Sequence, residues 1–263
     1  MKSYLAIIKA RFFCLLQYRA AALAGLFTQI FWGLIYTMIF AAFYREGQKE
    51  APIPLETACA FVWINQALLQ LLPWNFDKEV MQEIRTGNVA YSLIRPIELY
   101  WMWFCRAIAM RIVPTLLRCI PLFILALLFF DLAPPASFEA GALFVLSCLS
   151  AVLLSAAITT LVMLSLFWTI SGEGIVRLMP HIVILFSGLI IPLPFCPDWA
   201  QPFLQAQPFR GITDIPCRIY TGMIPTCDWP FAIGFQLAWT ALFILFGRFL
   251  TKRALSALVI QGG

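Results

Sequence analysis

The chain has 263 residues, of which 62% are hydrophobic and only 12% are charged. Soluble domains carry about a quarter charged residues, so this composition excludes an ordinary soluble fold and indicates a lipid bilayer as solvent. The net charge of +5 does not indicate nucleic-acid binding, because the basic residues stand at the ends of apolar segments instead of forming one patch.

Residues 1–19 alternate basic and apolar side chains at helical spacing, with Lys2 and Lys9 on the polar side. This pattern predicts an amphipathic interface helix that lies in the headgroup plane, although a plain topology anchor has the same pattern. The apolar run 20–43 is too long for the core of a signal peptide, so we expect the start of the chain to be retained. The apolar side of the helix consists of Leu5, Ile8, Phe12, Leu15 and Leu16.

Six apolar stretches approach the roughly 20 residues that are needed to cross a membrane, so we expect an all-α polytopic protein with six spans. The fifth is short and is interrupted by prolines. No repeat or low-complexity linker divides the chain, which predicts a single transmembrane domain over 1–263. The predicted spans are Ala20–Phe43, Thr57–Phe76, Ala107–Phe130, Ala140–Ile170, Leu178–Phe195 and Trp229–Gly247.

The distribution of lysine and arginine predicts the orientation of the chain. With both termini in the cytoplasm, thirteen basic residues lie on the inner side and four on the outer side. Arg111 is one of the thirteen and is expected to anchor the third span at the inner membrane edge. Arg118 is left within that span, where an arginine costs about 2.5–3.5 kcal/mol unless it snorkels, pairs or faces water.

The connection between the second and third spans runs for about thirty residues, whereas an ordinary helix connection has about 2–8. Residues 77–87 read as a short charged helix with Phe76, Val80 and Ile84 as its apolar stripe and Gly87 as its end. A solvated connector is the alternative to a cytoplasmic docking element. The candidate docking residues are Asp77, Lys78, Glu79, Gln82, Glu83, Arg85, Gly87 and Arg95.

Three amides in the second span, Asn65, Gln66 and Gln70, are too polar to face lipid. Interhelical hydrogen bonding and a substrate path, to which Arg118 would also belong, both explain them. The fourth span places four small residues at i+4 spacing, which favours close packing of helices within the chain or against a second copy. These residues are Ser147, Ala151, Ser155 and Thr159.

The segment 192–230 is rich in proline and aromatic residues, which fits either a re-entrant outer hairpin or a plain outer loop. Whether two of its cysteines form a disulfide stays open. We expect no metal site and no catalytic residue, because the chain has one histidine, His181, and neither a G-x-S-x-G nor an H-E-x-x-H motif. The cysteines of this segment are Cys196, Cys217 and Cys227.

Two segments resemble the type-2 ABC-exporter permeases, most closely the subgroup of viologen-type and daunorubicin-like exporters. The run Glu83–Pro96 is similar to the family stretch IR-x-G … L-x-RP. The run Ser187–Trp199 is similar to the outer segment of the family, which continues through Gln207-Pro208-Phe209, Pro216 and Tyr220-Thr221-Gly222.

The resemblance implies an interface helix, six spans, a coupling helix at 77–87 that contacts an ATPase, and a re-entrant hairpin at 192–230 before the sixth span. It also implies a transporter of two permease halves, identical or related, and two ATPase subunits in the inner membrane of a bacterium. The chain has no G-x-x-x-x-G-K-[ST] phosphate loop, so we expect ATP and Mg²⁺ on the partner and no cofactor on this chain.

The predicted function is therefore that of a non-catalytic permease subunit, which couples ATP hydrolysis by the partner to efflux of a hydrophobic or amphipathic substrate. A non-ABC channel or assembly subunit and an intramembrane enzyme are the alternatives. The substrate, and the roles of Arg118 and His181, stay open at this level.

Overall fold

A computed structural model describes residues 2–17, 19–45, 51–94, 96–169 and 173–256. Within these ranges every regular element is helical, as the composition predicts. Short 3₁₀ turns join several of the helices. The α-helices are α1 (Lys2–Leu16), α2 (Arg19–Arg45), α3 (Leu55–Leu68), α4 (Lys78–Thr86), α5 (Val89–Leu93), α6 (Leu99–Phe129), α7 (Phe138–Leu164), α8 (Glu173–Ser187), α9 (Gln201–Ala206), α10 (Asp214–Tyr220) and α11 (Trp229–Ser256).

Among the described residues, four helices are long and apolar enough to cross a membrane. They correspond to the first, third, fourth and sixth predicted spans. At the second and fifth predicted spans the structure has shorter helices, α3 with 14 residues and α8 with 15. The count of six spans therefore stays a prediction. The four candidate spans are Ala20–Arg45, Leu99–Phe129, Phe138–Phe167 and Thr226–Ser256.

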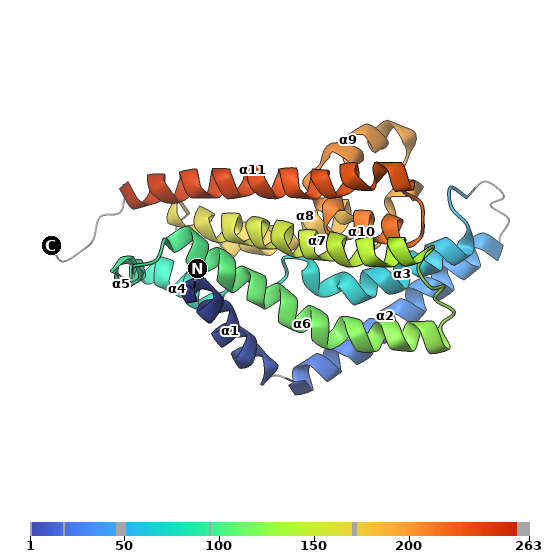
Figure 1. Ribbon diagram of the computed structural model, residues 1–263, viewed down its shortest axis with the longest axis horizontal. Helices are drawn as coiled ribbons and strands as arrows, with labels where there is room; N and C mark the ends of the chain where they lie inside the picture. Colours follow the sequence, from blue (N-terminus) through green and yellow to red (C-terminus); the bar gives the residue numbers. More distant parts are fainter. Residues whose placement is uncertain (1, 18, 46–50, 95, 170–172, 257–263) are drawn as a thin grey trace.

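The helices form an elongated bundle with two distinct ends (Figure 1). The first residues of α1 and the last turns of α11 lie at the same end as α4 and α5, and α9 and α10 lie at the opposite end (Figure 1). At the first end, Arg248 of α11 pairs with Glu98, and the Tyr4 hydroxyl of α1 accepts a hydrogen bond from the backbone N–H of Glu98. These contacts hold the first and last helices together at the α4 end.

Helix α7 is the centre of the bundle and packs against α6, α10 and α11. More than half of its most apolar stretch, 56%, is buried inside the protein, compared with 22% for each of the other three long helices. The four small residues predicted for packing are all fully buried, which lets neighbouring helices approach closely. They are Ser147, Ala151, Ser155 and Thr159.

The α-helical geometry of α3 ends inside the bundle. A 3₁₀ turn follows at Leu69–Leu71, and a non-helical stretch then leads to α4. Backbone carbonyls that lose helical partners at membrane depth need donors from elsewhere in the protein. Ser155 of α7 donates to the carbonyl of Leu71, and Arg111 of α6 donates to the carbonyl of Asn75 at 3.0 Å. Two polar side chains thus stabilise the break that makes α3 short.

The backbone carbonyls at the end of α8 also accept hydrogen bonds from side chains elsewhere in the protein. Asn65 donates to the carbonyl of Gly188 at 2.9 Å, and Thr213 donates to that of Ser187 at 2.8 Å. Gln207 donates to the carbonyl of Phe186, also at 2.8 Å. The short fifth helix therefore ends against polar groups of α3 and of the segment 192–230.

That segment folds into 3₁₀ turns and the two short helices α9 and α10. Helix α10 is mostly buried and packs against α7 and α3. The Tyr220 hydroxyl donates to the carbonyl of Ala133 at 2.9 Å and so attaches the segment to the α6–α7 connection. Its placement as a re-entrant hairpin stays a prediction.

Candidate functional site

The charged helix expected at 77–87 is present as α4, and its sequence sets both of its ends. Asp77 is the N-cap, whose carboxylate accepts from the backbone N–H groups of Glu79 and Val80. Gly87 ends the helix in the left-handed conformation at φ 74°, which glycine adopts without steric cost. The Val80 side chain is fully buried, so the apolar stripe of α4 faces the protein and its charged side remains accessible.

Four charged residues from three helices meet at the start of α4 and form what we call the ion-pair cluster: Arg11, Asp77, Glu79 and Arg106. Arg106 of α6 contacts Asp77 and Glu79 at 2.7 Å each. Arg11 of α1 contacts Asp77 at 3.2 Å and Glu79 at 2.5 Å. Because every member bridges two partners, the cluster ties α1, α4 and α6 into one unit.

The electrostatics of the cluster favour the ionised carboxylates. Burial by itself raises the pKa of Asp77, but the hydrogen bond from Arg106 and the charges of Arg106 and Arg11 outweigh burial and lower that pKa below its ordinary value. The hydrogen bond from Arg106 is the largest influence on Glu79 and lowers its pKa as well. Both carboxylates therefore stay charged at neutral pH, and the cluster stays closed.

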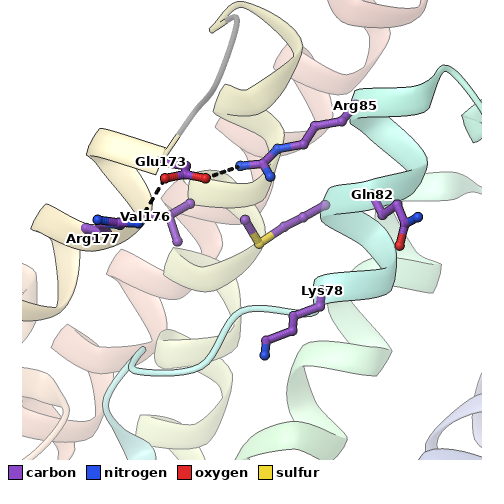
Figure 2. Close-up of a pocket in the computed structure, with 7 residues that line it drawn as sticks. Lys78, Gln82, Arg85, Glu173, Val176 and Arg177 are labelled. Carbon is purple, nitrogen blue, oxygen red and sulfur yellow. Dashed lines mark hydrogen bonds and ion pairs between the residues drawn. The ribbon is translucent and has the colours of Figure 1, made fainter.

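A groove of about 410 Å³ lies between α4 and the start of α8. Figure 2 shows Arg85 of α4 reaching across to Glu173 of α8, which also pairs with Arg177. Three basic residues and one carboxylate line the groove, so its walls are positively charged. The lining residues are Lys78, Met81, Gln82, Arg85, Glu173, Val176 and Arg177.

Apart from Gly87, which ends α4, and Arg95, the predicted docking residues divide into three groups. Asp77 and Glu79 belong to the ion-pair cluster. Glu83 accepts a hydrogen bond from Ser92 of α5 at 3.3 Å and so connects α4 to α5. Arg95 lies outside the described residues. The residues that line the groove are Lys78, Gln82 and Arg85.

Of the three predicted amides, Asn65 is occupied by protein contacts: its Nδ2 donates to the carbonyls of Gly188 and Leu189, and its Oδ1 accepts from Cys217. Gln66 lines a cavity of about 180 Å³ that is walled largely by aromatic and aliphatic side chains. Gln70 is half-buried in the 3₁₀ turn. The structure therefore does not gather the three amides into one polar path.

Arg118 reaches back along α6 to the first turn of α2, where its Nη2 donates to the carbonyl of Ala21 at 3.3 Å. Its guanidinium lies directly against Gly25, and any side chain at that position would collide with it. Ala21 stands near the end of α2 that joins α1. Of the alternatives for Arg118, the structure shows pairing with a backbone carbonyl, while snorkelling and a place in a substrate path stay predictions.

The small residues of α7 also have individual partners inside this chain. Ser147 donates to Gln236 of α11 at 3.1 Å, and Thr159 accepts from Arg111 of α6 at 2.8 Å. Ala151 has no polar group and only packs. The set thus packs within this chain, and packing against a second subunit stays a prediction.

Arg111 is where the sequence interpretation was wrong. We expected an anchor at the membrane edge, but the side chain is only 1% exposed and contacts Asn75 and Thr159 inside the bundle. The roles of Arg11, Arg106 and Glu173 were also missed. The charges of these residues were visible next to the apolar runs. The two arginines, however, lie 27 to 68 residues away in sequence from their partners Asp77 and Glu79.

The cysteines and His181 were the remaining candidates for a disulfide, a metal site or a proton-binding role. All eight cysteines are free, including the three of the segment 192–230. His181 is exposed, and its Nδ1 lies 2.8 Å from the carbonyl of Arg177. In the described part of the chain no group of histidine, cysteine and acidic residues is arranged to hold a metal ion.

The long apolar helices and the charged surface at one end define a multi-pass membrane protein. A family model described as "ABC-2 family transporter protein" matches residues 56–262, which is well over half of the chain. The chain therefore belongs to the ABC-2 transporter family and is a membrane-embedded component of a transport system. No match was found among the curated proteins.

Proposed function

We propose that the chain is one permease half of an ATP-driven exporter, and that α4 and the start of α8 form the surface on which a separate ATPase docks. Membership of the ABC-2 family supports the transport role. The ion-pair cluster carries the docking assignment, because it connects an accessible helix rigidly to the long helix α6 and to α1. A push on α4 would then move these helices together.

The groove between α4 and α8 suggests the chemistry of the docking partner. Lys78, Arg85 and Arg177 outnumber Glu173 along its walls, so an acidic surface on the ATPase is complementary. ATP and Mg²⁺ would bind the ATPase and not this chain. Two ATPase subunits and a second permease, identical or related, would complete the transporter.

The proposed topology has six crossings and both termini in the cytoplasm of a bacterium, with the protein in the inner membrane. In this arrangement α3 and α8 are short crossings whose broken ends are satisfied by Ser155, Arg111 and Asn65. The segment 192–230 would be the outer re-entrant element. The proposed substrate class is hydrophobic or amphipathic, as in the viologen- and daunorubicin-like subgroup.

Charge reversal in the groove tests the docking assignment. Lys78→Glu should lower co-purification of the ATPase from host membranes about tenfold, because it opposes an acidic partner, while insertion stays intact. Lys252→Glu is a matched control, since Lys252 is an exposed lysine near the end of α11. Normal ATPase recovery and full transport with Lys78→Glu and with Glu83→Ala/Arg85→Ala would refute the assignment.

A further inference from the structure

A second cavity, of about 550 Å³, lies at the opposite end of the molecule from α4, where α11 begins. It is bounded by α9, α10, the turn Pro208–Gly211 and the first residues of α11. The candidate span Thr226–Ser256 begins at this cavity. The ends of a span lie at the level of the lipid headgroups, so the cavity is positioned at a membrane–water boundary.

The charges beside this cavity are separated, with two arginines around one buried carboxylate on one side and Asp228 on another part of the wall. The carboxylate of Asp214 is fully buried and is shared by two arginines: Arg210 Nε lies 3.4 Å from Oδ2, and Arg218 Nε lies 2.9 Å from Oδ1. Two guanidinium groups on one carboxylate leave one positive charge in excess there, and Asp228 carries one negative charge on the same cavity. A ligand with one anionic and one cationic group would pair with both sides.

Arg210 is held in place as a wall of the cavity. Its Nη1 donates to the carbonyl of Gln205 at 3.2 Å, and its guanidinium carbon lies 5.7 Å from the centre of the Phe235 ring. Among the residues that the structure describes, the buried Nε–H of Arg210 has no hydrogen-bond partner, although Nε lies within ion-pair distance of Asp214. A fixed arginine with a remaining donor is well suited to a phosphate oxygen.

The other walls of the cavity match the remaining parts of a lipid. Asp228 is an exposed carboxylate on the same cavity, and Phe231 is 86% exposed beside it. From Phe231 a stripe of exposed apolar residues follows one side of α11 over about 27 Å at 1.5 Å per residue. The stripe continues through Ala238, Leu242, Leu245 and Phe249.

We propose that this cavity binds a zwitterionic glycerophospholipid, with the phosphate on Arg210, the ammonium group near Asp228 and an acyl chain along the stripe of α11. Asp228 disfavours a purely anionic headgroup, and the apolar stripe distinguishes a lipid from free phosphate. The inference goes beyond the transport function and requires only that α11 lies in a membrane. It is therefore tested on this chain without an ATPase.

The test is native mass spectrometry of the purified full-length chain in a neutral detergent, titrated with phosphatidylethanolamine. Arg210→Gln should weaken binding about tenfold, because a charge-assisted hydrogen bond to the phosphate is lost. Asp228→Asn should remove the preference for phosphatidylethanolamine over phosphatidylglycerol. Arg45→Gln, which changes an exposed arginine at the end of α2, should bind as the wild type does.

The variants are expected to fold, since Asp214 keeps Arg218 as a partner when Arg210 is replaced. Phe231→Ser provides a second variant, because its exposed ring is not part of the core, and it should also weaken lipid binding. Equal binding by wild type and Arg210→Gln would overturn the proposal. So would equal retention of diacylglycerol, displacement of the lipid by inorganic phosphate, or occupation of the cavity by a second copy of the chain.

Discussion

Asp77 accepts a 2.7 Å hydrogen bond from Nε of Arg106, which lies 29 residues further along the chain on α6. The same carboxylate caps α4 and contacts Arg11 of α1. One side chain therefore starts the helix proposed for docking and also attaches it to the two helices behind it. The two roles can be separated by mutation.

Asp77→Asn should keep the cap, because asparagine is as good an N-cap as aspartate, but lose the charge that Arg106 and Arg11 share. We expect a loss of about 1–3 kcal/mol in stability, since two partly buried arginines lose a charged acceptor. Asp77→Ala should cost about 1 kcal/mol more, because the cap is lost too. Thermal unfolding of the two variants in detergent measures the difference, and identical unfolding temperatures would contradict the double role.

The lowered pKa of Asp77 also predicts a pH dependence. A carboxyl whose pKa is lower in the folded state contributes stability above its unfolded pKa of about 3.9, and this stability is lost as the pH falls through the folded value. Wild type should therefore lose more stability than Asp77→Asn on acidification from pH 7 to pH 3. Thermal unfolding measured from pH 7 to pH 3 tests this. An equal decrease of the unfolding temperature in both proteins would show that Asp77 does not cause the pH dependence.

Arg118 and Gly25 are predicted to act as a pair. Gly25→Ala places a Cβ where the guanidinium lies, so it should displace Arg118 from the carbonyl of Ala21. Arg118→Leu should impair transport in the reconstituted complex while insertion stays normal. If the two residues are coupled, adding Gly25→Ala to Arg118→Leu should change stability and transport little further. A double-mutant cycle measures this coupling. Full transport by Arg118→Leu would leave the arginine with a packing role only.

Gly33 of α2 lies against the ring of Trp63, which is itself stacked on Phe130 at 4.3 Å. A Cβ on Gly33 would come within 2.7 Å of that ring, so Gly33→Ala should destabilise the protein by about 1–3 kcal/mol through overpacking. Gly234→Ala is the matched control, because nothing lies within 4 Å of its added Cβ and alanine favours the helix. Thermal unfolding should therefore move in opposite directions for the two variants.

The proposed orientation is tested with native thiols. Cys227 is exposed at the end that we propose faces outward, and Gln82 is exposed on α4 at the other end. A membrane-impermeant maleimide added outside intact cells should label Cys227 but not a cysteine introduced at Gln82. Cys227→Ser should reduce the labelling to that of the half-buried Cys196. Increased labelling from outside when the cysteine at position 82 is added to Cys227→Ser would reverse the topology.

The sequence by itself determined the elements whose causes are local. The apolar runs placed the four long helices, and the cap at Asp77 and the glycine at Gly87 set the ends of α4, because these signals act within one or two turns. The short helices were different. Hydropathy did not reveal that α3 stops at Leu68, since the donors that stabilise this break, Arg111 and Ser155, come from α6 and α7.

Tertiary structure alone decided which polar groups meet. In the sequence, Arg11 and Arg106 cannot be distinguished from other basic residues at the ends of spans. Only the packing of α1 and α6 beside α4 brings them to Asp77 and Glu79. Arg111 shows the same limit, because a charge near a membrane edge can turn toward water or into the protein. Its direction depends on whether buried acceptors lie within reach, and those acceptors belong to residues 36 and 48 positions away.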